Sequence, residues 1–243
     1  MYINTDGLIL RETAYKESSK ILTILTAGHG KLTVTARGAL RRNSKLAAAT
    51  QLLVFSEMTL FANRDRWTMT EARTAEQFIG LRRDVRLLAL ASYFAELAEA
   101  VADEDSPNPE LLPLCLNAFF ALSEGLKEPG YVKPAFELRL MSAAGFAPLI
   151  GQCARCGSEE PQHVYLNITE GTLFCDVCTS SGQYGLSRGA LHAARYVIGC
   201  ESKKLYSFTL GEQALKELSV AAEGYLLAHL DRSFRTLDYY KGI

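Results

Sequence analysis

The sequence predicts an α+β protein in which a small N-terminal β-barrel precedes a helical domain carrying an inserted four-cysteine zinc ribbon. Three observations support this fold class. Residues 2–80 are short runs rich in β-branched and aromatic residues. From about residue 81 the apolar residues recur at helical spacing, and two Cys-x-x-Cys pairs lie within residues 153–178. We therefore expect a barrel over residues 1–80 and a helical domain over residues 81–243, with the insert at about residues 150–183.

The barrel is predicted from five candidate strands, which read GLILRETAY, KILTILTA, KLTVTARGA, LLVFSEMTLFA and WTMTEARTAEQF. In the third run Leu32, Val34 and Ala36 alternate with polar residues, as in a half-buried strand. Turn residues separate the runs, with Gly-His-Gly at 28–30 and Asn-Arg-Asp at 63–65. Closure into a barrel removes exposed strand edges. A flat sheet packed on helices is the alternative.

Five helical segments follow the strands, and the cysteine segment lies between the third and the fourth. They read LRRDVRLLALASYFAELAEAVADED, PELLPLCLNAFFALSEGL, KPAFELRLMSAAG, SRGALHAARYVIG and GEQALKELSVAAEGYLLAHLDR. Ser-Pro-Asn-Pro at 106–109 ends the first segment. Gly145 is a candidate C-cap for the third.

The cysteine segment has the spacing of a zinc site. Two residues separate Cys153 from Cys156 and Cys175 from Cys178, and eighteen lie between the pairs. Each pair can fold as a knuckle that offers two thiolates to one side, and four thiolates complete a tetrahedron around Zn²⁺ at ~2.3 Å. Such a site leaves no position open for water or substrate, so we expect one structural zinc ion.

Other interpretations of the cysteines remain open at this point. A dithiol redox motif needs only one pair, usually at a strand-to-helix junction. His163 lies between the pairs and is a candidate competing ligand. The intervening HVYLNITEGTLFC predicts a hairpin with its tip at residues 169–171.

Composition and charge limit the class of protein. The chain has 243 residues, its N-terminal residues lack the order of a signal peptide, and no apolar run is long enough to span a membrane. We expect a cytoplasmic protein, in which six cysteines do not form a disulfide framework. Residues 1–86 hold 14 basic and 8 acidic residues, and residues 87–243 hold 12 and 19. The net charges of +6 and −7 sum to the −1 of the chain and suggest a polyanion-binding module beside a protein-binding one.

The basic residues concentrate in KLTVTARGALRRNSK, and no acidic residue occurs between Glu17 and Glu57. In a small barrel, cations on strands and loops can follow a phosphate backbone while aromatic residues stack on bases. Trp67 is a candidate for stacking or for the core. The candidate DNA-binding residues are Lys31, Arg37, Arg41, Arg42, Lys45, Arg64 and Arg66. No phosphate-binding loop, HExxH zinc motif or nucleophile elbow is present, so we expect no enzymatic activity.

The chain resembles the RecO family of bacterial DNA repair proteins. The resemblance rests on GHGKLTVTARGALRRNSK, FELRLMSAAGFAPLIGQCARCG, CDVC and HLDRSFRTLDYY, and it covers essentially the whole chain. It implies an N-terminal oligonucleotide/oligosaccharide-binding (OB) barrel, a helical domain and, in many members, a four-cysteine zinc site. It also implies a recombination mediator without turnover chemistry, located in the cytoplasm and associated with the nucleoid during repair. Such a mediator binds single- and double-stranded DNA, anneals complementary strands and, with RecR, helps load RecA onto DNA coated by single-stranded-DNA-binding protein.

Carried over by position, the resemblance assigns the four cysteines to zinc. It places Lys31 and Arg37 on the DNA face of the barrel, and Arg41, Arg42 and Lys45 in the basic loop after it. Arg139, in the FELRL helix, is a candidate contact for the acidic C-terminal tail of the single-stranded-DNA-binding protein. A zinc-ribbon transcription or translation adaptor and a zinc-dependent hydrolase are the rival interpretations.

Overall fold

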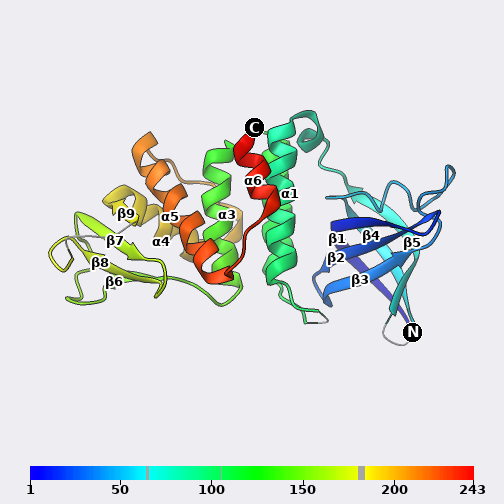
Figure 1. Ribbon diagram of the computed structural model, residues 1–243, viewed down its shortest axis with the longest axis horizontal. Coiled ribbons are helices and arrows are strands. Elements are labelled where there is room, and N and C mark those ends of the chain that lie inside the picture. The colour runs from blue at the N-terminus through cyan, green and yellow to red at the C-terminus, as the bar shows by residue number, and fades with distance from the viewer. Residues whose placement is uncertain (64–65, 105, 180–183) are drawn as a thin grey trace. The chain divides into compact units, whose positions relative to one another are not determined.

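The N-terminal residues form a closed five-stranded barrel in the computed structural model, which describes residues 1–63, 66–104, 106–179 and 184–243 (Figure 1). The strands are β1 (Tyr2–Tyr15), β2 (Ser19–Thr26), β3 (Gly30–Ala36), β4 (Phe55–Asn63) and β5 (Arg66–Glu76). Their order is β1-β2-β3-β5-β4, and β4 pairs back to β1. Among the described strands of the barrel, only β3 and β5 pair in parallel. This is an OB barrel, as expected, and the flat-sheet alternative is wrong.

Alternating residues of the strands fill the barrel. Leu32, Val34 and Ala36 are buried, whereas Thr33 between them is exposed, which confirms the alternation seen in the sequence. The interior cluster also includes Ile9, Leu22, Ile24, Leu60 and Met69. Burial of a large aliphatic side chain stabilises a fold by roughly 1.5–3 kcal/mol. The barrel therefore has a continuous apolar core that holds its surface loops in fixed positions.

The remaining elements are mostly helical. They are the 3-10 helices η1 (Ile79–Arg83) and η2 (Ser202–Lys204), the α-helices α1 (Val85–Val101), α2 (Leu111–Ser123), α3 (Pro129–Ala143), α4 (Arg188–Gly199), α5 (Glu212–Leu230) and α6 (Arg235–Gly242), and the strands β6 (Leu149–Cys153), β7 (His163–Asn167), β8 (Thr172–Cys175) and β9 (Tyr184–Ser187). Within the described ranges, no helix is both long and apolar enough to cross a membrane.

The chain divides into two compact units. The first contains Met1–Glu124 and Phe234–Ile243, and the second contains Gly125–Ser233. The barrel therefore shares a compact unit with α1, α2 and α6. The expected division into a barrel domain ending at residue 80 and a helical domain after it stays a prediction.

Lys31 joins the barrel to α1 inside the first unit. Its ammonium donates to the carbonyl oxygen of Glu99 at 2.9 Å, in the last turn of α1, and its backbone N–H donates to Asp103 at 3.0 Å. A cation is favourable there because the C-terminal carbonyls of a helix carry partial negative charge. Arg11 adds an ion pair to the Glu99 carboxylate at 2.8 Å. These contacts fix the end of α1 against β1 and β3.

The second unit holds the cysteine insert as a four-stranded sheet in the order β6-β8-β7-β9. Strands β7 and β8 form the predicted hairpin, which is confirmed, while β6 and β9 extend it on both sides. Glycines allow close packing on α5. A Cβ at Gly224 would lie 2.4 Å from the Tyr184 ring, and one at Gly171, in the hairpin turn, would lie 2.9 Å from the Tyr225 hydroxyl. The ribbon thus packs closely against α5.

A buried ion group joins α3 to α5 in the same unit. Lys133 contacts the carboxylates of Glu137 at 2.7 Å and Glu223 at 2.8 Å. The Glu137 side chain is fully buried and that of Lys133 is 7% exposed. Burial lowers the pKa of Lys133, but the two carboxylates outweigh this effect and raise it. The ammonium therefore stays charged between the helices.

Candidate metal centre and nucleic-acid interface

The four cysteines predicted to bind a metal lie together in the ribbon. Their Sγ atoms all lie within 4.8 Å of one another, and the Sγ atoms of Cys156 and Cys175 are 3.6 Å apart. A tetrahedral zinc with sulfur at ~2.3 Å places its sulfurs about 3.8 Å apart. The spacing therefore fits one tetrahedral ion. His163 starts β7 outside this cluster.

Each cysteine pair lies on a tight turn that directs both sulfurs to one side. In the first knuckle the N–H of Gly157 donates to the carbonyl of Cys153 at 2.9 Å, and Gly157 has a φ of +75°, which favours glycine. In the second, the N–H of Cys178 donates to the carbonyl of Cys175 at 3.0 Å. Arg155 links the knuckles by donating to the Cys178 carbonyl at 2.9 Å.

The electrostatics of the cluster also suit a cation. Burial raises the pKa of Cys153, but backbone N–H groups around its sulfur outweigh burial and lower the pKa to about 6. Burial, hydrogen bonds with the other three thiols and the charge of Cys153 raise the pKa of Cys178 to about 12. With Cys153 ionised, the Cys178 thiol therefore resists deprotonation. A divalent ion removes that repulsion, because a coordinating thiol is deprotonated. The four cysteines can hold a metal ion and fill its coordination sphere.

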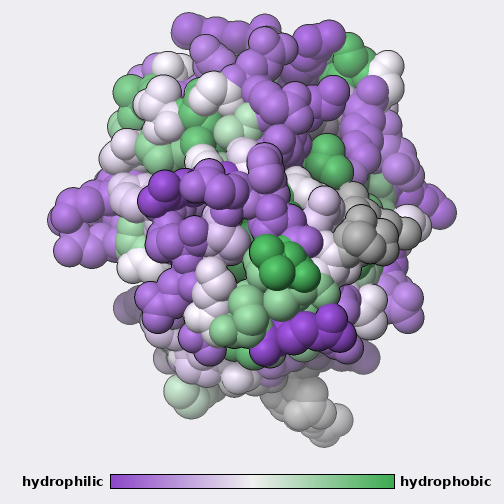
Figure 2. Space-filling model, turned by 90° about the vertical axis from the view of Figure 1, so that its left-hand side faces the viewer, coloured by the Kyte–Doolittle hydropathy of each residue, from purple (hydrophilic) through white to green (hydrophobic). Residues whose placement is uncertain are grey.

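The surface around the ribbon has few exposed apolar side chains. Figure 2 views the molecule from the side of β6–β9 and shows a mostly hydrophilic face with several separate apolar spots. Val177, inside the second knuckle, is 90% exposed and Leu149, at the start of β6, is 71% exposed. Isolated apolar residues of this kind are normal on protein surfaces.

The candidate nucleic-acid interface is the segment after β3, residues 37–45, which we call the cationic loop. Backbone contacts anchor its first half. The N–H of Gly38 donates to the hydroxyl of Ser19 at 3.3 Å, and the N–H of Leu40 donates to the carbonyl of Ser18 at 2.9 Å. Ala39 is buried in the barrel core, and Gly38 has a φ of +70°. The loop thus leaves the barrel in a fixed direction while its charged side chains remain outside.

Four cations of the loop are available to an anion. Arg37, Arg41, Arg42 and Lys45 are exposed, and none forms an ion pair with any residue in the described ranges. Other barrel cations are engaged: Arg73 binds the carboxylate of Glu57 through three hydrogen bonds. Four positive charges without a nearby counter-charge attract phosphate.

The other predicted barrel residues have different positions. Lys31 is half-buried against α1, and its ammonium donates to the carbonyl oxygen of Glu99, so it already forms a structural contact. Arg66 is exposed at the start of β5, and Arg64 lies outside the described residues. Trp67 is half-buried, packs against the barrel core and lies 6.5 Å from the His29 ring. The indole therefore contributes to the core and keeps part of its surface free.

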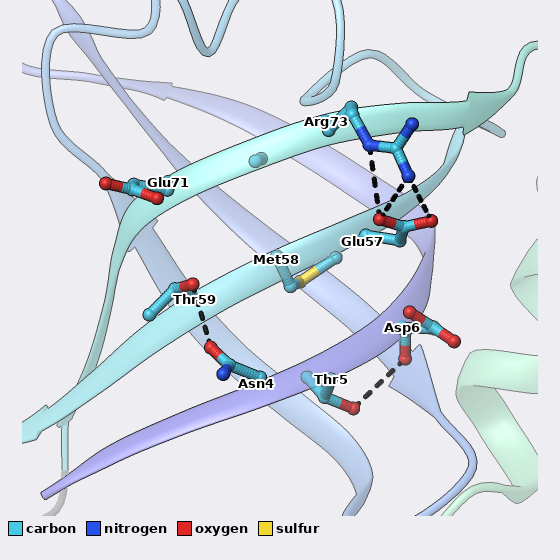
Figure 3. A pocket seen from close by; sticks show the side chains of 9 residues that line it. Asn4, Thr5, Asp6, Glu57, Met58, Thr59, Glu71 and Arg73 are labelled. Carbon is cyan, nitrogen blue, oxygen red and sulfur yellow. Dashed lines mark hydrogen bonds and ion pairs between the residues drawn. The ribbon is translucent and has the colours of Figure 1, made fainter.

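A different face of the barrel, on β1, β4 and β5, is unsuited to DNA. A groove of about 530 Å³ lies on these strands. Its lining includes Asp6, Glu57 and Glu71 (Figure 3). Among the described residues that line it, Arg73 is the only cation, and Glu57 neutralises that charge. Two carboxylates remain without a cation on the groove wall, so phosphate is repelled there. The cationic loop and this groove give the barrel surfaces of opposite sign.

Arg139, predicted to contact a partner, is half-buried in the second unit. Its guanidinium donates to the carbonyl oxygen of Cys200 and to the Cys200 sulfur at 3.3 Å. Cys200 is the C-cap of α4, so the positive charge of Arg139 meets the negative end of that helix. Nothing near Arg139 in the sequence indicates this contact, because Arg139 and Cys200 lie 61 residues apart. The same applies to Lys31 and Glu99.

Comparison with known proteins identifies the family to which the chain belongs. The family model "Recombination protein O N terminal" matches residues 1–78, and "Recombination protein O C terminal" matches residues 82–238. The DNA repair protein RecO of Acetivibrio thermocellus is 32% identical over 242 residues, covering 99% of this chain and 96% of the relative. The RecO protein of Symbiobacterium thermophilum is 31% identical over 97% of this chain and 95% of its own. That of Alkaliphilus metalliredigens is 30% identical over the whole of both chains. The chain belongs to the RecO family of DNA repair proteins.

Proposed function

We propose that this protein is a non-enzymatic recombination mediator whose barrel binds single- and double-stranded DNA. It anneals complementary strands and, with RecR, helps load RecA onto DNA coated by single-stranded-DNA-binding protein. The observation that supports this proposal best is the cationic loop, with four exposed cations and no described carboxylate paired to them. Family membership supports the role in DNA repair.

The loop binds the sugar–phosphate backbone. Arg and Lys pair with phosphates that are common to every sequence, so binding has little sequence preference. Arg37, Arg41, Arg42 and Lys45 supply these contacts, and Arg66, with Arg64 as a further candidate, adds to them at the start of β5. Lys31 takes part through the donors that its contact with Glu99 leaves free. The exposed part of Trp67 offers a surface for one base.

Annealing then requires no covalent bond to be made or broken. Two strands repel each other through their phosphates, and a protein that neutralises part of that charge on both lets complementary bases meet. The cysteine cluster takes no part in this step. We propose that its ion is a single structural zinc, which Cys153, Cys156, Cys175 and Cys178 hold as thiolates and which braces the ribbon.

Two protein contacts complete the proposal. The protein also binds RecR. The acidic tail of the single-stranded-DNA-binding protein binds beside Arg139, which shares its guanidinium between the end of α4 and the tail. Loss of tail binding in Arg139→Ala, with unchanged thermal stability, supports this contact. Unchanged tail binding removes Arg139 from it.

An annealing assay with two labelled complementary oligonucleotides tests the function directly, and energy transfer between the labels reports how fast the strands pair. We expect the purified protein to accelerate annealing without nucleotide, and the acceleration to fall as salt rises. A parallel assay for released phosphate or cleaved DNA is expected to give no signal. No acceleration at low salt contradicts the proposed function, and turnover of nucleotide or DNA contradicts its non-enzymatic character.

A further inference from the structure

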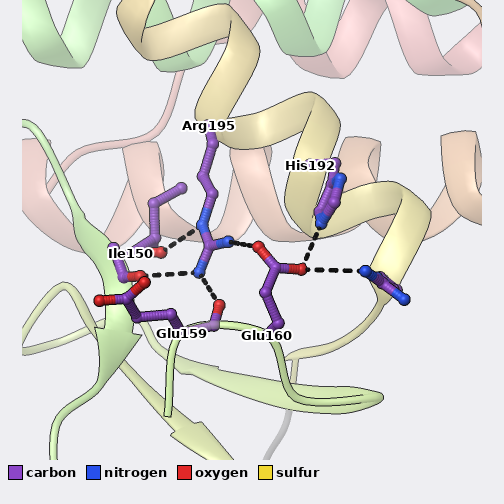
Figure 4. A network of polar contacts seen from close by, with 7 residues as sticks. Ile150, Glu159, Glu160, His192 and Arg195 are labelled. Atoms are coloured by element: carbon purple, nitrogen blue, oxygen red, sulfur yellow. Dashed lines mark hydrogen bonds and ion pairs between the residues drawn. The ribbon is translucent and has the colours of Figure 1, made fainter. Parts of the chain in front are cut away.

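Arg195 joins the ribbon to α4 through three backbone carbonyls (Figure 4). Its Nε donates to Ile150 at 2.8 Å, and its Nη2 donates to Gly151 at 2.8 Å and to Glu159 at 2.7 Å. The Arg195 side chain is only 22% exposed. A guanidinium offers five N–H donors in a planar fork, and here it spans two separate backbone segments.

Those two segments are the entry and the exit of the first metal knuckle. Ile150 and Gly151 lie three and two residues before Cys153, and Glu159 lies three residues after Cys156. The base of the same loop is closed by the N–H of Cys153, which donates to the carbonyl of Ser158 at 2.8 Å. Arg195 therefore binds both sides of the loop that carries two of the four sulfur ligands.

A carboxylate holds Arg195 in this orientation. Glu160 accepts from Arg195 Nη1 at 3.1 Å and lies 2.8 Å from His192 Nε2 and 3.4 Å from Arg188 Nη2. The hydrogen bond with His192 and the charges of the three basic groups outweigh burial and lower the pKa of Glu160. Arg188, His192 and Arg195 all come from α4, so one residue of the knuckle segment contacts three positions of one helix. Arg188 differs from Arg195 in contacting the carboxylate at longer range, 3.4 Å.

We propose that Arg195 is a positioning residue for the metal, because it holds both ends of the first knuckle against α4 and so orders Cys153 and Cys156 for coordination. This inference rests on the proposed zinc site. A loop ordered before the ion binds loses less conformational entropy on binding, and so retains the ion longer. Coupling is reciprocal, so bound metal also holds the ribbon on α4.

Metal release into excess chromogenic chelator tests the inference, with metal content of the purified wild type measured first. Loss of groups that orient metal ligands typically weakens metal binding 10–100-fold. We expect Arg195→Ala to release metal about 10–100 times faster than wild type. Arg195→Lys keeps the charge but cannot form the fork, and we expect it to release metal faster as well. Arg188→Ala is the matched control, from the same helix and the same carboxylate, and we expect a rate within about twofold of wild type.

Far-UV circular dichroism separates metal loss from unfolding. Faster release with a wild-type helical spectrum supports the inference. If Arg195→Ala loses both metal and helix, Arg195→Lys provides the test. Faster metal release from Arg195→Lys with a wild-type helical spectrum then supports the inference. Wild-type release from both Arg195 variants overturns the inference, as does equally fast release from Arg188→Ala. A wild-type protein that holds no metal overturns the zinc proposal itself, which is a distinct result.

Discussion

Replacement of Arg41 and Arg42 by alanine tests the DNA interface with little effect on the fold. Both side chains are exposed, and neither forms an ion pair with a described residue. The backbone N–H of Arg41 donates to the carbonyl of Gly38, and the backbone carbonyl of Arg41 accepts from the N–H of Ser44. Alanine keeps both hydrogen bonds. The double variant should therefore fold as the wild type does and lose two phosphate contacts.

The size of the effect follows from counterion release. Each phosphate contact contributes about 0.9 to the logarithmic salt slope of binding to duplex DNA and about 0.7 for single strands. Two lost contacts should reduce the slope by about 1.8 for duplex DNA and by about 1.4 for single strands. Between roughly 50 and 200 mM salt, the wild type should then lose about sevenfold more affinity for single strands than the variant, and about twelvefold more for duplex.

Fluorescence anisotropy of a labelled oligonucleotide across this salt range measures both slopes. Arg11→Ala/Arg73→Ala is the matched control, because it removes the same charge from exposed arginines of the same barrel that have carboxylate partners. We expect the control to keep nearly the wild-type slope. The reasoning is refuted if the Arg41/Arg42 variant keeps the wild-type affinity and slope, or if the control changes the slope equally.

Three further predictions concern stability. Chelation of the metal or Cys175→Ser should unfold the ribbon, seen as lost thermal stability, while the barrel retains DNA binding at reduced affinity; less than about one zinc per chain by metal analysis counts against the site. Lys133→Met should destabilise the protein by about 3–5 kcal/mol in urea unfolding, because it leaves carboxylates buried without their cation. The control Lys204→Ala breaks an exposed ion pair and should lower the free energy of unfolding by less than about 0.5 kcal/mol. Equal effects of the two substitutions contradict the account. Burial raises the pKa of Glu217, but hydrogen bonds from Ser187 and its other neighbours lower it below the usual 4.5. The stability difference between wild type and Glu217→Gln should therefore be full above pH 4.5 and disappear as the pH falls through the lowered pKa, so a difference independent of pH contradicts this assignment.

The parts of the fold that were predicted correctly depend on local patterns. Alternation in β3 identified a strand because side chains on opposite faces meet different surroundings. The cysteine spacing predicted the candidate metal centre because two knuckles carry all four cysteines in one short segment. Ala144 is the C-cap of α3, and Gly145 follows it with a φ of +85°, so the glycine lies one position beyond the predicted cap.

The parts that were missed depend on contacts between distant residues. Lys31 and Arg139 both bind the end of a helix, and nothing near them in the sequence indicates that helix. Their charges alone look the same as those of Arg41 and Arg42, whose side chains stay exposed. Helix α6 was not predicted either. Its Thr236 bonds Glu96 of α1, so its stability comes largely from tertiary contacts.

The central claim is that DNA phosphates bind the cationic loop of the barrel while the metal only braces the ribbon. Hydrogen exchange of the protein with and without a single-stranded oligonucleotide tests it most directly. We expect DNA to slow exchange at residues 37–45 and to leave the ribbon strands β6–β9 and the acidic groove on β1, β4 and β5 unchanged. Protection of the ribbon or the acidic groove, with residues 37–45 unchanged, contradicts the claim.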